Sequence, residues 1–316
     1  RQRQMCIRDR LCACLFIACE KDNENYEPVK PPIEEPSKPI MPPASTTNII
    51  KIRIGDLNMI VGSKQWNAVT YGNGKYVAVG DIGYITSSTD GITWTTPIST
   101  KPTPLWVGIT YGNGKFVAVA QSSGYIISST NGSTWSTPQS IGNKGWNAVT
   151  YGNGKFVAVG ESGYITSSTD GVTWTTPKKV GTYGFQAVTY GNGKYVAVGL
   201  LGYMSSSVDG VTWSTPKLID SASLYAVTSG SGKFVAAGES GHITSSTDGI
   251  TWSVPQVVGN KQWNAVTSGS GKYVVVGDNG LVTTSTDGAT WTEPEEIRNE
   301  SGNIFWSNLY GVCAMH

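Results

Sequence analysis

The chain of 316 residues has little charge, little histidine and almost no arginine in its main part. Charged residues make up 14% of it, histidine occurs twice, and the arginines after residue 48 are Arg53 and Arg298. A protein that follows phosphate groups needs a basic stripe, so we expect no nucleic-acid partner. Long amphipathic helical patterns are also missing, which excludes a mainly helical fold.

Cysteine is scarce outside the first nineteen residues, which hold Cys6, Cys12, Cys14 and Cys19, while Cys313 stands near the other end. No disulfide framework can therefore cross the long stretch between them. No cysteines and histidines have the spacing of a metal site, and two histidines offer little for a Ser/His/Asp set. We expect no metal and no cofactor.

The first ten residues, RQRQMCIRDR, match nothing that follows them. They resemble the conceptual translation of a transposase-based sequencing adapter, in which QMCIRD is the reading of the mosaic end. Residues 1–10 are therefore left out of the fold. The alternative is that their arginines form the basic start of a signal peptide.

The next segment, LCACLFIAC (11–19), is apolar but too short to span a bilayer. It resembles the end of a bacterial lipoprotein signal peptide, because FIA precedes Cys19 in the lipobox pattern. The resemblance implies cleavage before Cys19 and lipidation of its thiol, which gives a durable anchor when several acyl chains are attached. Cys14 is a second candidate, and a cleaved secretory peptide is the alternative.

Residues 20–48 are rich in proline, glutamate and lysine and poor in large apolar groups. Such a stretch cannot bury enough surface to fold, and proline keeps it extended, so we expect a linker. Its first letters, EKDNE, resemble the acidic export tag of lipoproteins in Bacteroidota. That resemblance implies a protein anchored on the outer face of the outer membrane.

Near-copies of SSTDGITW (87–94) recur about every forty residues. Each repeat has four short segments rich in aromatic and β-branched residues, which in the first repeat are WNAVTY, KYVAVG, YITSST and TWTTP. The hairpin signals GNG and DG separate them. Four antiparallel strands in about forty residues predict one blade of a β-propeller. The tryptophans that end the six copies are Trp94, Trp135, Trp174, Trp213, Trp252 and Trp291.

The shared element S-x-D-G-x-T-W resembles the Asp-box (BNR) repeat of the sialidase-like propeller superfamily, with one residue fewer between Asp and Gly. The resemblance covers residues 62–297. It implies a turn in which the carboxylate accepts main-chain N–H groups, the glycine takes a positive φ, and the tryptophan packs between sheets. Catalysis needs convergent groups, whereas these copies are spread around a ring, so we expect a structural role. The six positions are Asp90, Asn131, Asp170, Asp209, Asp248 and Asp287.

Two further segments match parts of a blade. MIVGSKQW (59–66) parallels QVVGNKQW (256–263), and LYGVCAM (309–315) parallels LYAVTSG (224–230). We therefore expect an all-β propeller domain over residues 49–316, with six complete four-stranded blades and a partial seventh. In this interpretation the ring has seven blades and the last one, which joins both termini, is truncated. A complete six-bladed ring is the alternative.

Enzymatic activity is not expected. Sialidases of the superfamily clamp the substrate carboxylate with three arginines, which the two arginines of the whole propeller domain cannot supply. His242 takes the position held by Tyr84, Tyr125, Tyr164 and Tyr203 in other repeats, so we expect it to pack like them. A glycoside hydrolase with paired carboxylates stays the alternative, because four acidic residues share one blade position.

Binding is the function class that the repeats favour. Their differences in length fall in connections that open on one face, opposite the Asp-box turns. On that face an acidic or amide residue often follows the second strand, and tryptophan often starts the first strand. Aromatic rings beside carboxylates are typical of sugar sites; the alternative is that the tryptophans pack between blades. The candidate ligand-binding residues are Trp66, Asp81, Trp106, Gln121, Trp146, Glu161, Glu239, Trp263 and Asp278.

The sequence thus predicts a monomeric, surface-exposed lipoprotein whose propeller face binds a glycan or a protein without catalysis. Its contact with the membrane would be through the lipid anchor alone. Because Phe185 and Leu200 break the pattern in the fourth repeat, binding is expected away from that blade. The alternative from another class is a structural or assembly-factor propeller that takes no small ligand.

Overall fold

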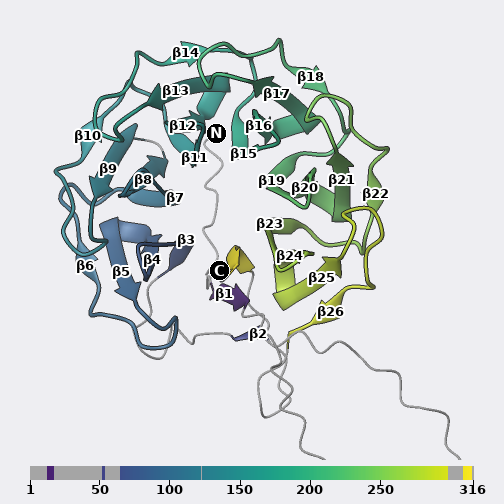
Figure 1. The fold of residues 1–316 in the computed structure, drawn as a ribbon, viewed down its shortest axis with the longest axis horizontal. Coiled ribbons are helices and arrows are strands. Elements are labelled where there is room, and N and C mark those ends of the chain that lie inside the picture. Colours follow the sequence, from purple (N-terminus) through teal and green to yellow (C-terminus); the bar gives the residue numbers. More distant parts are fainter. Residues whose placement is uncertain (1–12, 18–51, 54–64, 122, 298–308, 315–316) are drawn as a thin grey trace, which may run out of the picture.

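A computed structural model describes residues 13–17, 52–53, 65–121, 123–297 and 309–314. Seven sheets are arranged in a ring around a central axis (Figure 1). Six of them are four-stranded antiparallel blades, and each is built from strands that follow one another in the chain. This confirms the all-β propeller and the six complete repeats that the sequence predicts.

The first strand of each blade lies nearest the axis and the fourth lies at the rim (Figure 1). The first three blades contain β3 (Trp66–Gly72), β4 (Lys75–Gly80), β5 (Tyr84–Ser88) and β6 (Ile98–Ser99); β7 (Leu105–Gly112), β8 (Lys115–Gln121), β9 (Tyr125–Ser129) and β10 (Gln139–Ser140); and β11 (Trp146–Gly152), β12 (Lys155–Gly160), β13 (Tyr164–Ser168) and β14 (Lys178–Lys179). The next three contain β15 (Phe185–Gly191), β16 (Lys194–Gly199), β17 (Tyr203–Ser207) and β18 (Lys217–Leu218); β19 (Leu224–Gly230), β20 (Lys233–Gly238), β21 (His242–Ser246) and β22 (Gln256–Val257); and β23 (Trp263–Gly269), β24 (Lys272–Gly277), β25 (Leu281–Ser285) and β26 (Glu295–Glu296).

The hairpin between the first two strands of a blade has a two-residue loop. In blade 1 Gly72 pairs with Lys75, and the loop residues Asn73 and Gly74 have φ of 48° and 71°. Two consecutive positive φ angles characterise a type I′ turn, whose twist matches that of the flanking strands and which favours Asn-Gly. The GNG signal of the sequence therefore marks the hairpin correctly.

The fourth strand differs from the predicted one. In blade 1 it is Ile98–Ser99, paired with Tyr84 and Ile85, rather than TWTTP (93–97). Before it, Trp94 forms a single bridge with Ser88. Pro97 has no N–H to give to the ladder, and it separates this bridge from the short outer strand.

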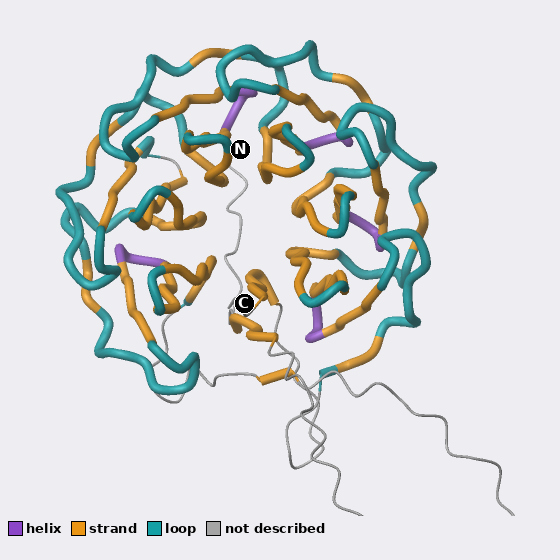
Figure 2. The backbone as a smooth tube through the Cα atoms, in the orientation of Figure 1, coloured by secondary structure: helices purple, strands orange, loops and turns teal. Residues whose placement is uncertain are grey.

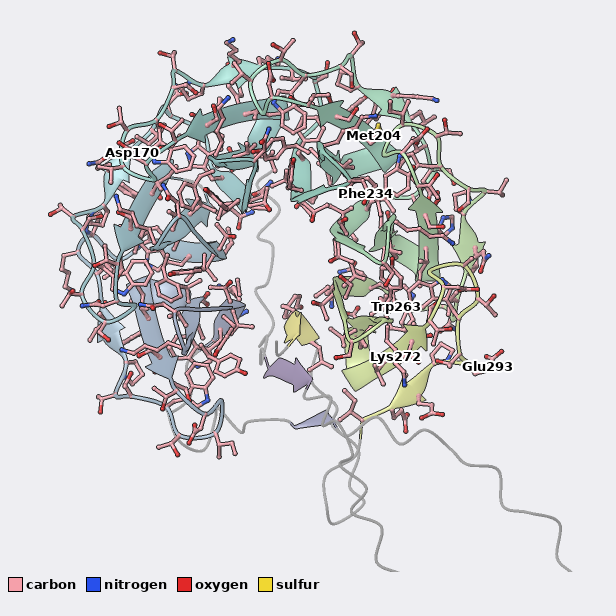
Figure 3. All side chains as sticks on the ribbon, viewed as in Figure 1. Asp170, Met204, Phe234, Trp263, Lys272 and Glu293 are labelled. Carbon is pink, nitrogen blue, oxygen red and sulfur yellow. The ribbon has the colours of Figure 1, made fainter. Side chains whose placement is uncertain are left out.

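The core lies between blades, because both faces of each sheet are covered. Val77, Ala78 and Val79 in β4 are all fully buried, which explains why the second strands are apolar without alternation. Met204 and Phe234 belong to one such cluster between blades 4 and 5, and both are labelled in Figure 3. The burial of each such large side chain contributes about 1.5–3 kcal/mol.

A lysine at the start of the second strand ties each of blades 1 to 5 to the next blade. Lys155 Nζ, for example, donates a hydrogen bond of 2.9 Å to the main-chain oxygen of Asp209 in the following blade. The sequence signal is the lysine that follows the hairpin glycine in every repeat, and its role was not anticipated. The other four bonds run from Lys75 to Asn131, Lys115 to Asp170, Lys194 to Asp248 and Lys233 to Asp287.

The seventh sheet is smaller than the other six. It has the order β2 (Ile52–Arg53), β1 (Ala13–Ile17) and β27 (Leu309–Ala314), and β1 runs parallel to β27. Strand β27 lies against the innermost strands β23 and β3, so this sheet completes the ring (Figure 2). A partial seventh blade is confirmed.

Strand β1 falls within residues 11–19, the segment that resembles a signal peptide, and outside the predicted domain limits of 49–316. An apolar segment of this length can form a strand or the end of a signal peptide, and the predicted lipidation site, Cys19, lies outside the described residues. Signal processing there stays a prediction. Within the described ranges, no helix has the length and apolar character needed to cross a bilayer.

Candidate functional site

The repeated aspartate organises the turn after the third strand, which we call the Asp turn. Asp90 Oδ1 accepts hydrogen bonds from the N–H groups of Ile92 at 2.8 Å and Thr93 at 2.7 Å. Ser88 Oγ donates to the same carboxylate and accepts the N–H of Gly91, whose φ is +73°. Asn131 Oδ1 makes the same two main-chain bonds in blade 2, each at 2.9 Å. The turn therefore needs an acceptor oxygen and not a charge.

The aspartate carboxylates of the Asp turns all have lowered pKa values. Hydrogen bonds from the main-chain N–H groups, with a further one from the serine hydroxyl, lower the pKa of Asp90 to about 2. The same main-chain bonds lower the pKa of Asp170 and Asp248 to about 2, and they also depress those of Asp209 and Asp287. Each carboxylate is thus kept ionised by its own turn.

The opposite ends of the strands carry the face of interest. It consists of the short turns between second and third strands together with the connections that lead into each first strand, and we call it the loop face. Five of the short turns are 3-10 turns: η1 (Asp81–Gly83), η2 (Glu161–Gly163), η3 (Leu200–Gly202), η4 (Glu239–Gly241) and η5 (Asp278–Gly280). A main-chain bond joins each turn to the neighbouring connection, as from Asp81 N to Gln65 O at 3.0 Å.

The tryptophans predicted to stack against a ligand are not available on this face. They are fully buried and pack between blades, as Trp106 does against Val79 and Ile85 of the preceding blade. Its Nε1 donates to Thr100 Oγ1 at 3.2 Å, beneath the connection. A ring without an open face cannot stack on a sugar, so the stacking role is corrected to blade packing. The four residues concerned are Trp66, Trp106, Trp146 and Trp263.

Two of the candidate carboxylates are held by amides on the first strand. Asn67 Nδ2 donates to Asp81 Oδ1 at 2.9 Å, and Asn264 Nδ2 donates to Asp278 Oδ1 at 2.9 Å. In blade 3 the equivalent Asn147 instead bonds the main-chain oxygen of Phe185 at 2.8 Å. The sequence signal for these amides is the pair Trp-Asn at the start of the first strand, which we had not used.

In the other repeats the residue at this blade position has different contacts or is of another type. Glu161 is half-buried and makes no side-chain hydrogen bond with a described residue, while Glu239 is exposed and accepts the N–H of Ser223 at 3.3 Å. Gln121 is half-buried at the end of β8, and Leu200 is exposed. None of the four candidate carboxylates forms an ion pair with a residue that the structure describes, so their charges are open to an outside partner. These four are Asp81, Glu161, Glu239 and Asp278.

Two of these carboxylates act on the phenol of Tyr225. Burial raises the pKa of its phenol, and the negative charge of Glu239 raises it further, with a smaller contribution from Asp278. A partly offsetting effect comes from a hydrogen bond with the side chain of Ser223. Geometry also brings the two blades together here, because η4, which carries Glu239, lies against β23, whose Asn264 holds Asp278.

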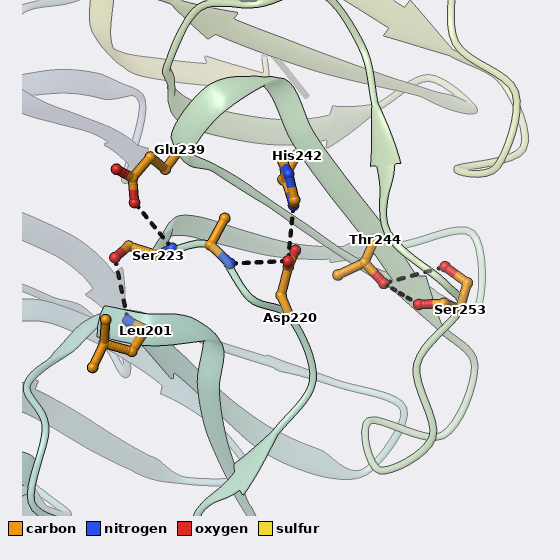
Figure 4. Close-up of polar contacts among 8 residues, drawn as sticks. Leu201, Asp220, Ser223, Glu239, His242, Thr244 and Ser253 are labelled. Atoms are coloured by element: carbon orange, nitrogen blue, oxygen red, sulfur yellow. Dashed lines mark hydrogen bonds and ion pairs between the residues drawn. The ribbon is translucent and has the colours of Figure 1, made fainter.

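A buried acid and a histidine meet where blade 4 leads into blade 5 (Figure 4). His242 Nδ1 lies 2.8 Å from Asp220 Oδ1, which also accepts the N–H of Ala222 at 3.1 Å. Asp220 is 5% exposed, and its Oδ2 has no hydrogen-bond partner among the described residues. The sequence analysis missed Asp220, which stands where Gly142, Gly181 and Gly259 occur in other connections.

Exposed apolar side chains gather on blade 4. From the sequence pattern, binding was expected away from this blade. Leu200 is 37% exposed, Leu201 49% and Tyr183 41%, and the Tyr183 ring stacks on Tyr203 with centroids 5.0 Å apart. Leu200 N donates to Gly184 O, so the turn is fixed beside the connection that carries Tyr183. These residues offer an apolar surface on the loop face.

The arrangement shows no metal centre. Among the residues that the structure describes, no three histidine, cysteine, aspartate or glutamate side chains are grouped so that they could hold an ion. The loop face thus combines open carboxylates, a phenol and exposed apolar groups, which are suited to contacts with another molecule.

No protein-family model matches the chain, and no curated protein matches it. Many solved structures resemble it, including the following two. One, described as YCF48 bound to D1 peptide, is 18% identical, with 73% of this chain and 82% of that chain covered and a TM-score of 0.57. The other, selenomethionine-substituted virginiamycin B lyase from Staphylococcus aureus, is 12% identical, with 79% and 88% covered and a TM-score of 0.67. These likenesses show the β-propeller fold.

Proposed function

We propose that the protein binds a polypeptide on the loop face without transforming it. The observation that carries the proposal is a combination on one face. Its carboxylates form no ion pair with a described residue, and Leu200, Leu201 and Tyr183 are exposed. A polypeptide can offer cationic and apolar side chains together, and charge complementarity would steer its approach. YCF48, which shares the fold, is described with a bound peptide, which supports this class of ligand.

Burial of the tryptophans favours a polypeptide over a glycan. The aromatic platform that a sugar ring needs is absent at Trp66, Trp106, Trp146 and Trp263, because these rings fill the space between blades. Carboxylates beside apolar side chains instead match the composition of a protein-binding surface. The resemblance of the Asp turns to the Asp-box repeat is then a matter of fold and not of sialidase activity.

A binding role also agrees with the residues that the blades lack. Residues 65–297 contain no arginine, so the blades have no guanidinium to clamp a substrate carboxylate. His242 directs Nδ1 to Asp220, and no hydrogen bond joins its ring to a serine, threonine or cysteine side chain among the described residues. We therefore propose that the loop face recognises its partner and leaves its bonds intact.

We further propose that the propeller is held at the cell surface by lipid on Cys19, which the sequence supports through the lipobox pattern and the linker over residues 20–48. Expression in a Gram-negative host with a labelled fatty acid tests this. Cys19→Ser should remove the label and release the protein from the membrane. Cys14→Ser should keep both the label and the membrane association. Label retained in Cys19→Ser would contradict the assignment of the anchor to that residue.

The binding proposal is tested with two variants that lose equal charge from opposite faces. The loop-face variant combines Asp81→Asn, Glu161→Gln, Glu239→Gln and Asp278→Asn. The control combines Asp90→Asn, Asp170→Asn, Asp209→Asn and Asp248→Asn, which the turn should tolerate because Asn131 makes the same bonds. Both are compared with the unaltered protein by fluorescence polarisation, using labelled peptide pools of positive, neutral and negative charge and a panel of neutral and sialylated oligosaccharides.

We expect the positively charged peptide pool to bind, the loop-face variant to weaken that binding about tenfold, and the control to leave it unchanged. Oligosaccharide binding without peptide binding would contradict the proposal. So would an equal loss of peptide affinity in both variants, because the effect would then come from net charge and not from the loop face.

A further inference from the structure

We propose that blades 4 to 6 form a two-part subsite that takes a basic side chain next to an apolar one in the same polypeptide. This inference rests on the proposed function and names the chemistry of the partner. The acid pair is Glu239 in η4 and Asp278, which is bonded to Asn264 of the adjacent strand β23, and the apolar patch is Tyr183, Leu200 and Leu201.

The acid pair has unused capacity to accept hydrogen bonds. Asp278 Oδ1 receives a bond from Asn264, and Glu239 Oε2 receives one from Ser223 N, so each carboxylate keeps an oxygen to which no described residue donates a hydrogen bond. Lys261, in the connection before blade 6, forms an ion pair with neither of them. Since η4, which carries Glu239, lies against the first strand of the blade that carries Asp278, an ammonium or guanidinium group is the complementary ligand.

The apolar patch is distinctive among the repeats. Leu201 occupies the left-handed position of its turn, with φ of 54°, where other blades have Ser162, Ser240 or Asn279. A large side chain is disfavoured in that conformation, yet here it is exposed and follows Leu200, whose N–H donates to Gly184 O next to Tyr183 in the chain. Ile82 of blade 1 is the matched case without a patch, because it is exposed at φ of 53° but follows Asp81 and not an apolar residue.

Ser223 joins the two parts. Its Oγ accepts the N–H of Leu201 at 3.2 Å, and its own N–H donates to Glu239 Oε2 at 3.3 Å (Figure 4). The connection that carries Ser223 is in turn held by the contact between Asp220 and His242. The apolar patch and the acid pair are therefore fixed relative to each other, which favours a ligand whose basic and apolar side chains are neighbours.

The test uses four pools of short fluorescein-labelled peptides with the fixed central pairs Leu-Arg, Leu-Gln, Ser-Arg and Ser-Gln and random glycine, serine and alanine flanks. We expect the Leu-Arg pool to bind about tenfold more tightly than either single-feature pool. Glu239→Gln with Asp278→Asn should abolish the preference for arginine. Leu201→Asn should abolish the preference for leucine without unfolding the turn, because Asn279 occupies the same position in blade 6.

Two controls separate the subsite from general effects. Asp170→Asn with Asp209→Asn removes the same charge from the opposite face, and Ile82→Asn removes an exposed apolar side chain from the same turn position in blade 1; both should leave the two preferences unchanged. The inference is overturned if the Leu-Arg pool shows no preference, or if peptide affinity depends on Asp81 and Glu161 and not on Glu239 and Asp278. In those cases polypeptide binding itself would stand, whereas failure of every pool to bind would overturn the proposed function as well.

Discussion

His242 and Asp220 form a contact that occurs in one blade connection, with Nδ1 2.8 Å from Oδ1. In blade 4 the same two positions are Tyr203 and Gly181, and Tyr203 stacks on Tyr183 instead. Blade 5 thus replaces an aromatic contact with a polar one, at the connection that carries Ser223. Because the carboxylate is buried and the histidine is 20% exposed, the pair should contribute to stability.

Removal of one partner of this pair should lower the free energy of unfolding, and replacement of both should restore most of it. Asp220→Gly should lower the free energy of unfolding by about 1–3 kcal/mol, because it leaves His242 without its acceptor. The double change Asp220→Gly with His242→Tyr restores the combination found in blade 4 and should recover most of that loss. Urea unfolding of the three proteins measures this, and equal losses in the single and double variants would show that the pair is not coupled.

The Asp turns lead to a prediction about residue type. Asp170→Ala should lower the free energy of unfolding by about 1 kcal/mol, since two main-chain N–H groups lose their acceptor. Asp170→Asn should change it little at neutral pH, as Asn131 keeps both bonds in blade 2. Thermal or urea unfolding compares the two variants. A large loss in Asp170→Asn would mean that the charge itself is needed there.

The same turns predict how stability depends on pH. The pKa of Asp90, Asp170 and Asp248 is about 2 in the folded protein, against a usual 3.8, so the unfolded chain binds protons first as the pH falls. The stabilisation is therefore complete above about pH 4 and is lost as the pH falls to about 2. Replacing these three residues with asparagine should make the fall smaller when unfolding is measured across that range. An unchanged pH profile would show that the turns do not bind protons differently on unfolding.

The lysine contacts between blades provide a matched comparison. Lys155→Met removes a bond of 2.9 Å to Asp209 O and should lower the free energy of unfolding by about 0.5–1.5 kcal/mol. Lys272, labelled in Figure 3, starts the second strand of blade 6 and makes no side-chain hydrogen bond with a described residue. Lys272→Met should therefore have little effect. Similar losses in both variants would assign the effect to the aliphatic stem and not to the hydrogen bond.

Much of the fold could be predicted from the sequence because each repeat contains its own turn signals. Asn73-Gly74 marks a type I′ hairpin and Asp90-Gly91 marks the Asp turn, so local chemistry defines where strands begin and end. The fourth strand was misplaced because TWTTP has the composition of a strand, whereas Pro97 interrupts the pairing. Composition alone does not show which residues complete a ladder.

The site was harder to predict because it depends on contacts between blades. Trp66 and Trp106 begin first strands at the loop face, but packing of adjacent blades buries them, and no pattern within one repeat reports that packing. Asp220 and His242 are 22 residues apart and could have been found as two departures from the repeat in one blade. The contact of η4, which carries Glu239, with β23 joins two blades and needed the structure.

The most direct measurement of the central claim is where a bound polypeptide touches the propeller. A peptide with a photoreactive phenylalanine beside arginine can be cross-linked to the protein, and mass spectrometry then identifies the attachment sites. Binding at the loop face predicts cross-links within residues 180–184, 200–202, 219–223 and 239–241. Cross-links confined to the Asp turns or to the outer strands would contradict the account.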